Sequence, residues 1–241
     1  MILKCLVAVF FMFSMAVVGG EVWAFSQEFV RFGKKDAYEG FKKRWNSEYT
    51  HFFKDSVKDY PILAIQDLDD PEYTYLMPIL SYARLGIFED GLEKFQDTLK
   101  RDLTLGFSST LNFEVKSLGI YLSECSYIPE FINASLCNMP YVHYQTFSLT
   151  PGNGEIFEQR LKKMAFEEAM KKSNVCWRVF KTVFGGDVPK YVVYCFAQSQ
   201  DALESDRLHF IDEELKSIVR RYREGKGILR RDLSILVPTN T

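Results

Sequence analysis

The sequence predicts an α+β fold in which one order of elements, β-α-β-β-α-β, occurs twice. The stretch 175–199 is typical of two strands joined by a tight Gly-Gly-Asp turn, and the stretch 60–81 has a similar pattern. A shift of 118 residues places Pro71 on Pro189 and Tyr73 on Tyr191, and a shift of 120 aligns two helical stretches upstream. Such self-similarity indicates a repeated unit. Two unrelated segments that share a hairpin are the alternative.

The N-terminal 24 residues have the pattern of a secretory signal peptide. Lys4 precedes an uncharged, mostly apolar run over residues 5–18, and small residues suited to cleavage follow at Val22 and Ala24. The run is shorter than the ~20 residues of a membrane-spanning helix, so we expect cleavage after Ala24 rather than an uncleaved anchor. The mature protein is then expected to be periplasmic or secreted, with no membrane span.

Charge and composition narrow the class of partner. The chain has 30 basic and 32 acidic residues, and its net charge of −2 argues against nucleic acid or anionic lipid as the main partner. Aromatic residues make up 15% of the chain, which is more than a core of this size needs. A small apolar or aromatic ligand, or a protein partner, is therefore expected.

Residues 25–122 form the first predicted unit. A strand is expected at Phe25–Phe32, and a helix begins at Asp36, where Glu39 completes a capping-box pattern. Lys42 and its two basic neighbours are expected on the outer side of this helix. The inner stripe consists of Tyr38, Phe41, Trp45, Tyr49, Phe52 and Val57. Strands at 61–66 and 72–77, a helix over 85–101 and a strand at 111–122 complete the unit.

Residues 123–140 are predicted to be a linker, and residues 141–241 the second unit. The linker is rich in Pro and Asn, and Asn133 begins a glycosylation sequon that matters only in a host that glycosylates. The second unit is expected to have a strand at Tyr141–Leu149, a helix with Phe157 and Leu161 inward, and the hairpin. A short helix at 200–207, an amphipathic helix from Phe210 to Tyr222 and a strand at 229–238 follow.

Each predicted half has the element order of a ferredoxin-like unit. The helices of such a unit cover one face of its sheet and leave the other face bare, and packing the two bare faces together buries both. We therefore expect two tandem ferredoxin-like units packed sheet to sheet, with halves that do not fold apart.

Four cysteines follow residue 24: Cys125, Cys137, Cys176 and Cys195. An even number in an exported chain permits two disulfides. Cys176 and Cys195 are expected almost opposite each other on paired strands, and Cys125 and Cys137 share one loop-like stretch. Four buried free thiols are the alternative, and no spacing typical of a zinc site is present.

Three consecutive stretches carry a resemblance to a known superfamily. LTPGNGEIFEQRLKKM, the WRVFKTVFGG hairpin and YVVYCFAQS together resemble the dimeric α/β barrel superfamily, which includes stress-responsive barrel proteins, NIPSNAP-type proteins, antibiotic-biosynthesis monooxygenases and chlorite dismutases. The resemblance covers residues 141–206, extends faintly over 36–122, and implies a dimeric α/β barrel formed within one chain. It implies no single activity. Chlorite dismutases use a haem-ligating His and a distal Arg, and the chain offers no matched motif, so the cofactor stays open, haem included.

Four residues are candidates for ligand binding. By alternation, His143 shares a strand face with Tyr141, Gln145 and Phe147, and we expect this face to line the barrel interior. His143 could act there as a proton shuttle or axial ligand. Arg178, with Tyr191 or Tyr194, could bind an acidic or aromatic ligand. An ordinary strand histidine and a charged residue at the barrel rim are the alternatives.

Two functions from different classes follow from these features. The first is an exported, non-enzymatic protein that binds an apolar ligand or a partner. The second is a small oxidoreductase or monooxygenase-like barrel enzyme, cofactor-free or haem-dependent. The sequence favours the first, because it contains no matched set of catalytic residues. The absence of a G-x-S-x-G, P-loop, G-x-G-x-x-G or H-E-x-x-H motif argues against hydrolases, nucleotide enzymes and metalloproteases.

Overall fold

The computed structural model describes residues 21–54, 61–79, 82–99, 101–129, 139–171, 176–185, 190–205, 210 and 212–235. Most of the expected signal peptide therefore lies outside the described residues, as do Cys137 and the sequon at Asn133. Within the described ranges, no helix combines the length and apolar character needed to cross a membrane.

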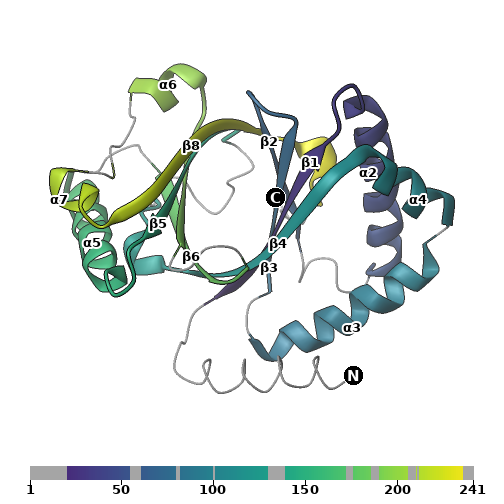
Figure 1. Cartoon of the computed structure of the whole chain (residues 1–241), viewed down its shortest axis with the longest axis horizontal. Coiled ribbons are helices and arrows are strands. Elements are labelled where there is room, and N and C mark those ends of the chain that lie inside the picture. The colour runs from purple at the N-terminus through teal and green to yellow at the C-terminus, as the bar shows by residue number, and fades with distance from the viewer. Residues whose placement is uncertain are drawn as a thin grey trace.

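Eight antiparallel strands close into a barrel, seen end-on in Figure 1. Their order around the barrel is β1-β3-β2-β8-β5-β7-β6-β4. Each half of the chain thus contributes four neighbouring strands, and the halves meet where β2 pairs with β8 and β4 with β6. The strands are β1 (Val22–Val30), β2 (Leu63–Asp67), β3 (Glu72–Pro78), β4 (Leu111–Tyr121), β5 (Tyr141–Leu149), β6 (Cys176–Phe184), β7 (Lys190–Ala197) and β8 (Val219–Leu229).

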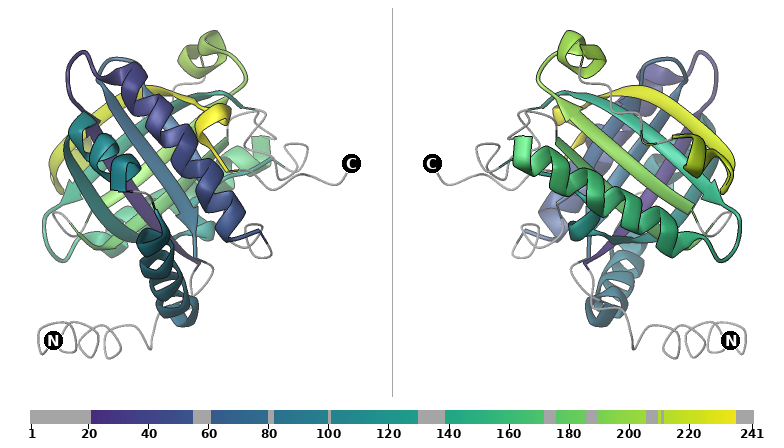
Figure 2. Two further views of the ribbon diagram at one scale, coloured as in Figure 1. Left: turned by 90° about the vertical axis from the view of Figure 1, so that its right-hand side faces the viewer. Right: turned by 90° about the vertical axis from the view of Figure 1, so that its left-hand side faces the viewer.

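Helices cover the outside of the barrel on two opposite sides (Figures 1 and 2). In Figure 2, α2 lies over the strands of the first half and α5 lies over those of the second half. The helices are α2 (Lys35–Phe52), α3 (Tyr82–Thr98), α4 (Arg101–Thr110), α5 (Gly154–Lys171), α6 (Gln200–Ser205) and α7 (Glu213–Lys216), and two 3₁₀ turns lie at η2 (Ser123–Cys125) and η4 (Arg231–Leu233).

The two halves match each other element by element. The helices α2 and α5 both have 18 residues, and the strands β4 and β8 both have 11 residues with nearly the same burial pattern. Strand pairing fixes the equivalence, because Glu28 lies opposite Tyr73 in the first half and Phe147 lies opposite Tyr191 in the second. By the same pairing, Leu63 matches Arg178. The single shift of 118 residues therefore holds for β3 and β7 but not for β2 and β6, because the two hairpin turns differ in length.

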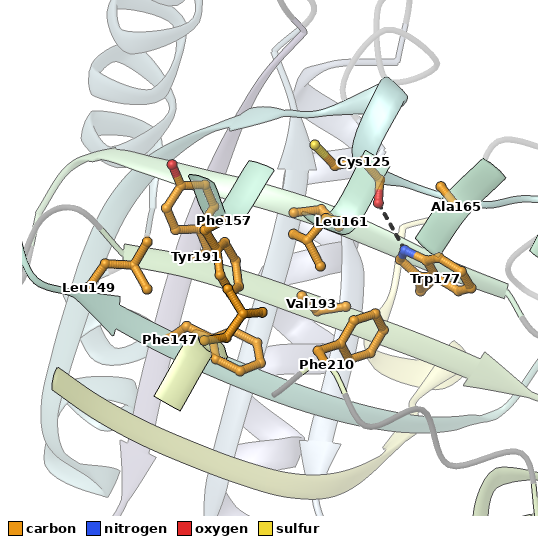
Figure 3. Packing of buried hydrophobic residues seen from close by; sticks show 12 residues of the cluster. Cys125, Phe147, Leu149, Phe157, Leu161, Ala165, Trp177, Tyr191, Val193 and Phe210 are labelled. Atoms are coloured by element: carbon orange, nitrogen blue, oxygen red, sulfur yellow. Dashed lines mark hydrogen bonds between the residues drawn. The ribbon is translucent and has the colours of Figure 1, made fainter. Parts of the chain in front are cut away.

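Three hydrophobic clusters hold these layers together. One fills the barrel interior and includes Phe25, Phe180 and Tyr194. A second lies between α2 and the first half of the sheet. The third lies between α5 and the second half, where Phe157 and Leu161 pack on Phe147, Tyr191 and Val193 (Figure 3). The Trp177 indole closes one end of this third cluster by donating to the Cys125 carbonyl at 2.9 Å.

The C-terminal region corrects the prediction of an amphipathic helix over Phe210–Tyr222 and a last strand at 229–238. The long element there is the strand β8, and α7 has only four residues. Gly225 and Gly227, expected to stop a helix, lie inside β8. A Cβ on Gly225 would meet the Tyr144 hydroxyl, and one on Gly227 would come within 2.8 Å of the Gln66 carbonyl oxygen. These glycines therefore permit close approach of neighbouring strands.

The first unit corrects three further predictions. β1 begins at Val22, not Phe25, and Val22 and Trp23 are buried, so a cut after Ala24 would remove three residues of a barrel strand. The capping box is absent, because α2 begins after Lys34 without a side-chain cap. Lys42, expected on the outer side of the helix, is buried against the sheet.

Candidate functional site

A cavity of about 380 Å³ lies on the outer face of the first half of the sheet, beneath α2 and α3. Its walls are mostly apolar and include Trp45, Met77 and Leu92. Its polar groups include Ser26 and Glu28 of β1, Lys42 of α2 and Tyr75 of β3. The other polar residues of the lining are Glu89, Gln96, Glu114, Lys116 and Ser117. A volume in this range is typical of small-molecule sites.

A chain of hydrogen bonds forms the floor of this cavity. Lys42 Nζ donates to Glu28 Oε1 at 2.7 Å, and both side chains are almost completely buried. The Tyr38 hydroxyl donates to Glu28 Oε2 at 2.5 Å. The Tyr75 hydroxyl lies 2.7 Å from the Tyr38 hydroxyl, and because the Tyr38 proton is directed to Glu28, Tyr75 donates to Tyr38. We call Glu28, Tyr38, Lys42 and Tyr75 the polar cluster.

Aromatic rings surround the ammonium group in the polar cluster. Lys42 Nζ lies 3.7 Å from the ring centroid of Tyr75, 5.0 Å from that of Trp45 and 5.3 Å from that of Phe107. Ring faces attract a cation, and more strongly where water is excluded. Burial raises the pKa of Tyr38 well above its usual range, and the nearby Tyr75 and Glu28 add to this; burial and Glu28 do the same for the pKa of Tyr75. Both phenols therefore stay protonated and act as donors.

The second half of the chain places only apolar residues at the equivalent positions. Glu28 corresponds to Phe147, Tyr38 to Phe157 and Lys42 to Leu161, by the matched strand pairing and the matched helices. Figure 3 shows all three in one cluster, with Phe157 and Leu161 of α5 facing Phe147 of β5. Tyr75 likewise corresponds to Val193. The barrel thus folds around an apolar seam at this position, and the polar cluster is an additional feature of the first half.

A different tyrosine and glutamate pair is present in both halves. Tyr73 donates to Glu39 at 2.6 Å, and Tyr191 donates to Glu158 at 2.6 Å. Each bond ties the main helix of its half to the sheet. The Tyr191 hydroxyl is therefore part of a repeated helix-to-sheet contact, which accounts for its burial.

The sheet separates the four residues that the sequence singled out. His143 shares its strand face with Phe147, which packs under α5, whereas Val142 belongs to the barrel interior. The prediction that His143 faces the interior is therefore wrong. His143 lies buried on the outer face, with Nδ1 3.4 Å from Gln145 Nε2 and Nε2 3.3 Å from Glu224. Tyr191 lies on this same outer face.

Arg178 and Tyr194 do face the interior, where they are cross-strand neighbours. The Arg178 guanidinium lies 5.7 Å from the Trp23 ring and 5.5 Å from the Tyr121 ring. Burial raises the pKa of Tyr194. The interior cavity beside Tyr194 is only about 20 Å³, space for roughly one water molecule. This cavity, as lined by the described residues, is too small for the ligand that was expected there.

The cysteine pairing predicted on the second hairpin is also wrong. Cys125, Cys176 and Cys195 are free thiols. Cys176 lies opposite Phe196 and Cys195 opposite Trp177, so the two cysteines are offset by one residue and point to opposite faces of the sheet. Cys176 packs in the barrel interior and Cys195 packs under the outer helices. Cys137 lies outside the described residues.

The sequence contains a pattern that indicates the buried face of α2, but the charge of Lys42 led to its assignment to the opposite side of the helix. Tyr38, Lys42, Asn46 and Tyr49 follow one another at steps of four, four and three residues, which places them on a single helix face, and all four are buried. Lys42 was assigned to the outer side because lysine is seldom buried without a partner. The partner, Glu28, lies 14 residues away on a different element, and its position depends on the register of β1.

The described residues that line this cavity include no histidine and no cysteine, so they do not fit the histidine-ligated haem that the superfamily resemblance raised. Among the residues that the structure describes, no group of three His, Cys, Asp or Glu side chains is placed to hold a metal ion.

The architecture is that of α+β proteins built on a closed eight-stranded antiparallel barrel, a fold shared by monooxygenase-like and chlorite dismutase structures. An anthrone oxidase-like protein superposes with a TM-score of 0.60 at 13% identity, covering 88% of this chain and 92% of that chain. A monooxygenase-like protein from Lactobacillus acidophilus gives 0.58 at 9%, covering 90% and 96%. Chlorite dismutase from Candidatus Nitrospira defluvii gives 0.53 at 10%, covering 90% and 94%. No protein-family model and no curated protein matches the sequence.

Proposed function

We propose that the chain is a small oxidase- or monooxygenase-like enzyme that acts on an aromatic substrate in the cavity beneath α2 and α3. The polar cluster carries this proposal, because a buried ion pair and two phenols lie where the second half needs only apolar side chains. The likeness to an anthrone oxidase-like protein and to a monooxygenase-like protein supports it as well. These likenesses, together with the cavity, favour an enzyme over the non-enzymatic binding protein that the sequence favoured.

The cluster suits a substrate that becomes an oxyanion when it loses a proton. A phenol or an enolisable aromatic ketone fits the apolar walls, and its oxygen lies against the Lys42 ammonium. This ammonium stabilises the negative charge in a site that excludes water, and Glu28 accepts the proton. The resulting electron-rich carbanion is what reacts with dioxygen. For anthrone, one O₂ is consumed and one water is released for each anthraquinone formed.

Anthrone is therefore the probe of choice. Oxygen uptake by purified protein with anthrone should exceed the spontaneous rate and should fall at least tenfold in Lys42→Met. The matched control is Lys171→Gln, which removes a lysine whose Nζ pairs with Glu168 on the exposed surface of α5 and should keep the wild-type rate. No uptake above the spontaneous rate by wild-type protein would rule out an anthrone-type oxidase.

Binding without turnover would instead support a binding protein. The fluorescent phenol 1-naphthol separates the two cases, because it reports occupancy of the cavity without needing a reaction. If wild-type protein binds 1-naphthol saturably, Lys42→Met weakens that binding, and anthrone is not oxidised, the result would support the non-enzymatic binding protein.

The matched halves also support a proposal about the chain as a whole. We propose that residues up to 122 and from 141 onward are tandem ferredoxin-like units, since element order, helix length and strand register repeat. Export remains a proposal that rests on the apolar run at residues 5–18. Because β1 includes Val22, we place any cleavage before that residue.

A further inference from the structure

A second site lies at one open end of the barrel, away from the cavity beneath α2. An open cleft of about 390 Å³ is formed there by β5, β7 and β8. Its lining consists of Thr146, Ser148, Lys190, Arg221, Tyr222 and Arg223. Among the residues that the structure describes, this lining has three basic side chains and no aspartate or glutamate.

Strand register brings the basic residues and hydroxyls together. Ser148 of β5 lies directly opposite Arg221 of β8 on one side and opposite Lys190 of β7 on the other. Thr146, on the same face of β5, lies opposite Arg223. Cross-strand neighbours have Cβ atoms about 5 Å apart. The cleft therefore places the Ser148 hydroxyl between two basic side chains and the Thr146 hydroxyl beside a third.

Arg223 is held in place by acidic groups at the edge of this region. Its guanidinium lies 2.9 Å from Glu72 Oε2 and 3.7 Å from Asp70 Oδ2. This pairing fixes one cation of the cleft and offsets part of its charge. Arg221 lies on the same strand as Arg223, and Lys190 lies on the far side of Ser148. Basic side chains that line a concave surface attract anions.

The first half shows that the barrel does not need these cations. Its residues equivalent to Ser148, Arg221 and Lys190 are Phe29, Phe113 and Glu72. Phe29 and Phe113 stack there with ring centroids 4.1 Å apart. In the first half, two stacked aromatic rings and one glutamate thus lie at the positions where the second half has a serine and two basic residues.

We propose that this cleft binds a small oxyanion, specifically the phosphate group of a phosphate monoester. Guanidinium, ammonium and hydroxyl donors that converge from three strands suit a tetrahedral group with several acceptor oxygens. The cleft is larger than a phosphate ion alone, which leaves space for the organic part of the ester. Arg221 and Lys190 are the residues expected to contact the phosphate.

Inorganic phosphate and glycerol 3-phosphate test this site by thermal unfolding at constant ionic strength, with chloride as the reference anion. A ligand that binds only the folded state raises the melting temperature in a saturable way. Both phosphates should raise it for wild-type protein. Arg221→Gln and Lys190→Gln, made separately, should each weaken the apparent affinity at least tenfold. Arg221 is exposed, so its replacement should leave the fold intact.

Lys163→Gln is the matched control, because Lys163 is an exposed lysine on α5 that lies 4.0 Å from Glu167 on the same solvent-exposed helix face. It should respond to phosphate as wild-type protein does. The proposal fails if phosphate raises the melting temperature no more than chloride, or if the increase persists unchanged in both cleft variants. Succinate provides the remaining comparison, and a response to succinate that equals or exceeds the phosphate response would overturn the assignment to phosphate.

Discussion

At the scale of single residues, the burial of a charged or polar side chain depends on the partner that the fold places beside it. Lys42 is buried because Glu28 reaches it from another element, and His143 is buried on the outer face of the sheet rather than inside the barrel. The sequence identified the strand that contains His143 to the residue, but not the direction of its faces. Alternation gives two sets of side chains, and both sets on β5 mix polar and aromatic groups.

Arg230 offers a prediction at this scale. Its guanidinium donates to both carboxylate oxygens of Glu39, at 2.6 and 2.7 Å, and to Asp232 at 2.9 Å. Hydrogen bonds from Arg230 are the main cause that lowers the pKa of Glu39 and of Asp232. A carboxylate with a lowered pKa stabilises the fold above its usual pKa, and this contribution is lost as the pH falls through the lowered value.

Arg230→Gln should therefore reduce the free energy of unfolding most at pH 7 and somewhat less at about pH 3. At about pH 3 the contribution of the two carboxylates has begun to be lost, but the strongly lowered pKa of Asp232 keeps part of it. Urea unfolding at both pH values measures the difference. Arg44→Gln is the control, because Arg44 makes a solvent-exposed pair with Asp102 that should contribute little at either pH. An equal loss for Arg230→Gln at the two pH values would show that packing, not charge, is what Arg230 provides.

At the scale of elements, local sequence patterns predicted most strands and the main helices. They failed where pairing with neighbouring strands determines whether a segment is a helix or a strand. The strand Tyr141–Leu149 and the hairpin strands β6 and β7 agree with the sequence pattern. The strand β8 does not, because glycines that indicate the end of a helix in an isolated segment serve here as points of close contact between strands. That information lies in β2 and β5, far away in the chain.

Gly227→Ala tests this explanation of β8. A methyl group at this position would meet the Gln66 carbonyl and the Ile65 side chain, both within 2.8 Å. We expect a loss of about 1–3 kcal/mol in the free energy of unfolding. Gly40→Ala in α2, where a new Cβ meets nothing within 4 Å, should instead be neutral or stabilising by up to about 1 kcal/mol. Equal effects of the two changes would contradict the account of β8.

The start of β1 gives a second prediction for an element. A chain that begins at Phe25 lacks Val22 and Trp23, whose side chains are buried. It should be less stable than a chain that begins at Glu21 by at least about 3 kcal/mol, the usual cost of removing one large buried aromatic side chain. Thermal unfolding of the two purified chains measures this. Equal melting temperatures would mean that the barrel does not need residues 21–24, and cleavage after Ala24 would then be compatible with the fold.

At the scale of the whole molecule, the two halves serve as internal references for each other. Contacts that occur in both halves, such as Tyr73 with Glu39 and Tyr191 with Glu158, hold the shared fold together. Features of one half only, such as the polar cluster and the basic cleft, are the ones that the fold does not require. Sequence comparison of the halves could not reveal this, because the offset between equivalent residues changes from one element to the next.

The central claim is that the polar cluster serves chemistry and not folding, and one set of variants tests it most directly. Lys42→Leu alone leaves Glu28 buried without its cation and should cost about 3–5 kcal/mol. The triple variant Glu28→Leu, Tyr38→Phe and Lys42→Leu makes the floor of the cavity resemble the apolar seam under α5. Because replacing a whole buried ion pair by apolar groups is often neutral or stabilising, its stability should return close to that of wild-type protein.

The decisive measurement is urea unfolding of wild-type, Lys42→Leu and triple-variant protein, together with anthrone oxidation and 1-naphthol binding by the same samples. The account predicts a triple variant that is as stable as wild-type protein but neither oxidises anthrone nor binds 1-naphthol with wild-type affinity. A triple variant as unstable as Lys42→Leu, or one that keeps full activity and binding, would contradict it.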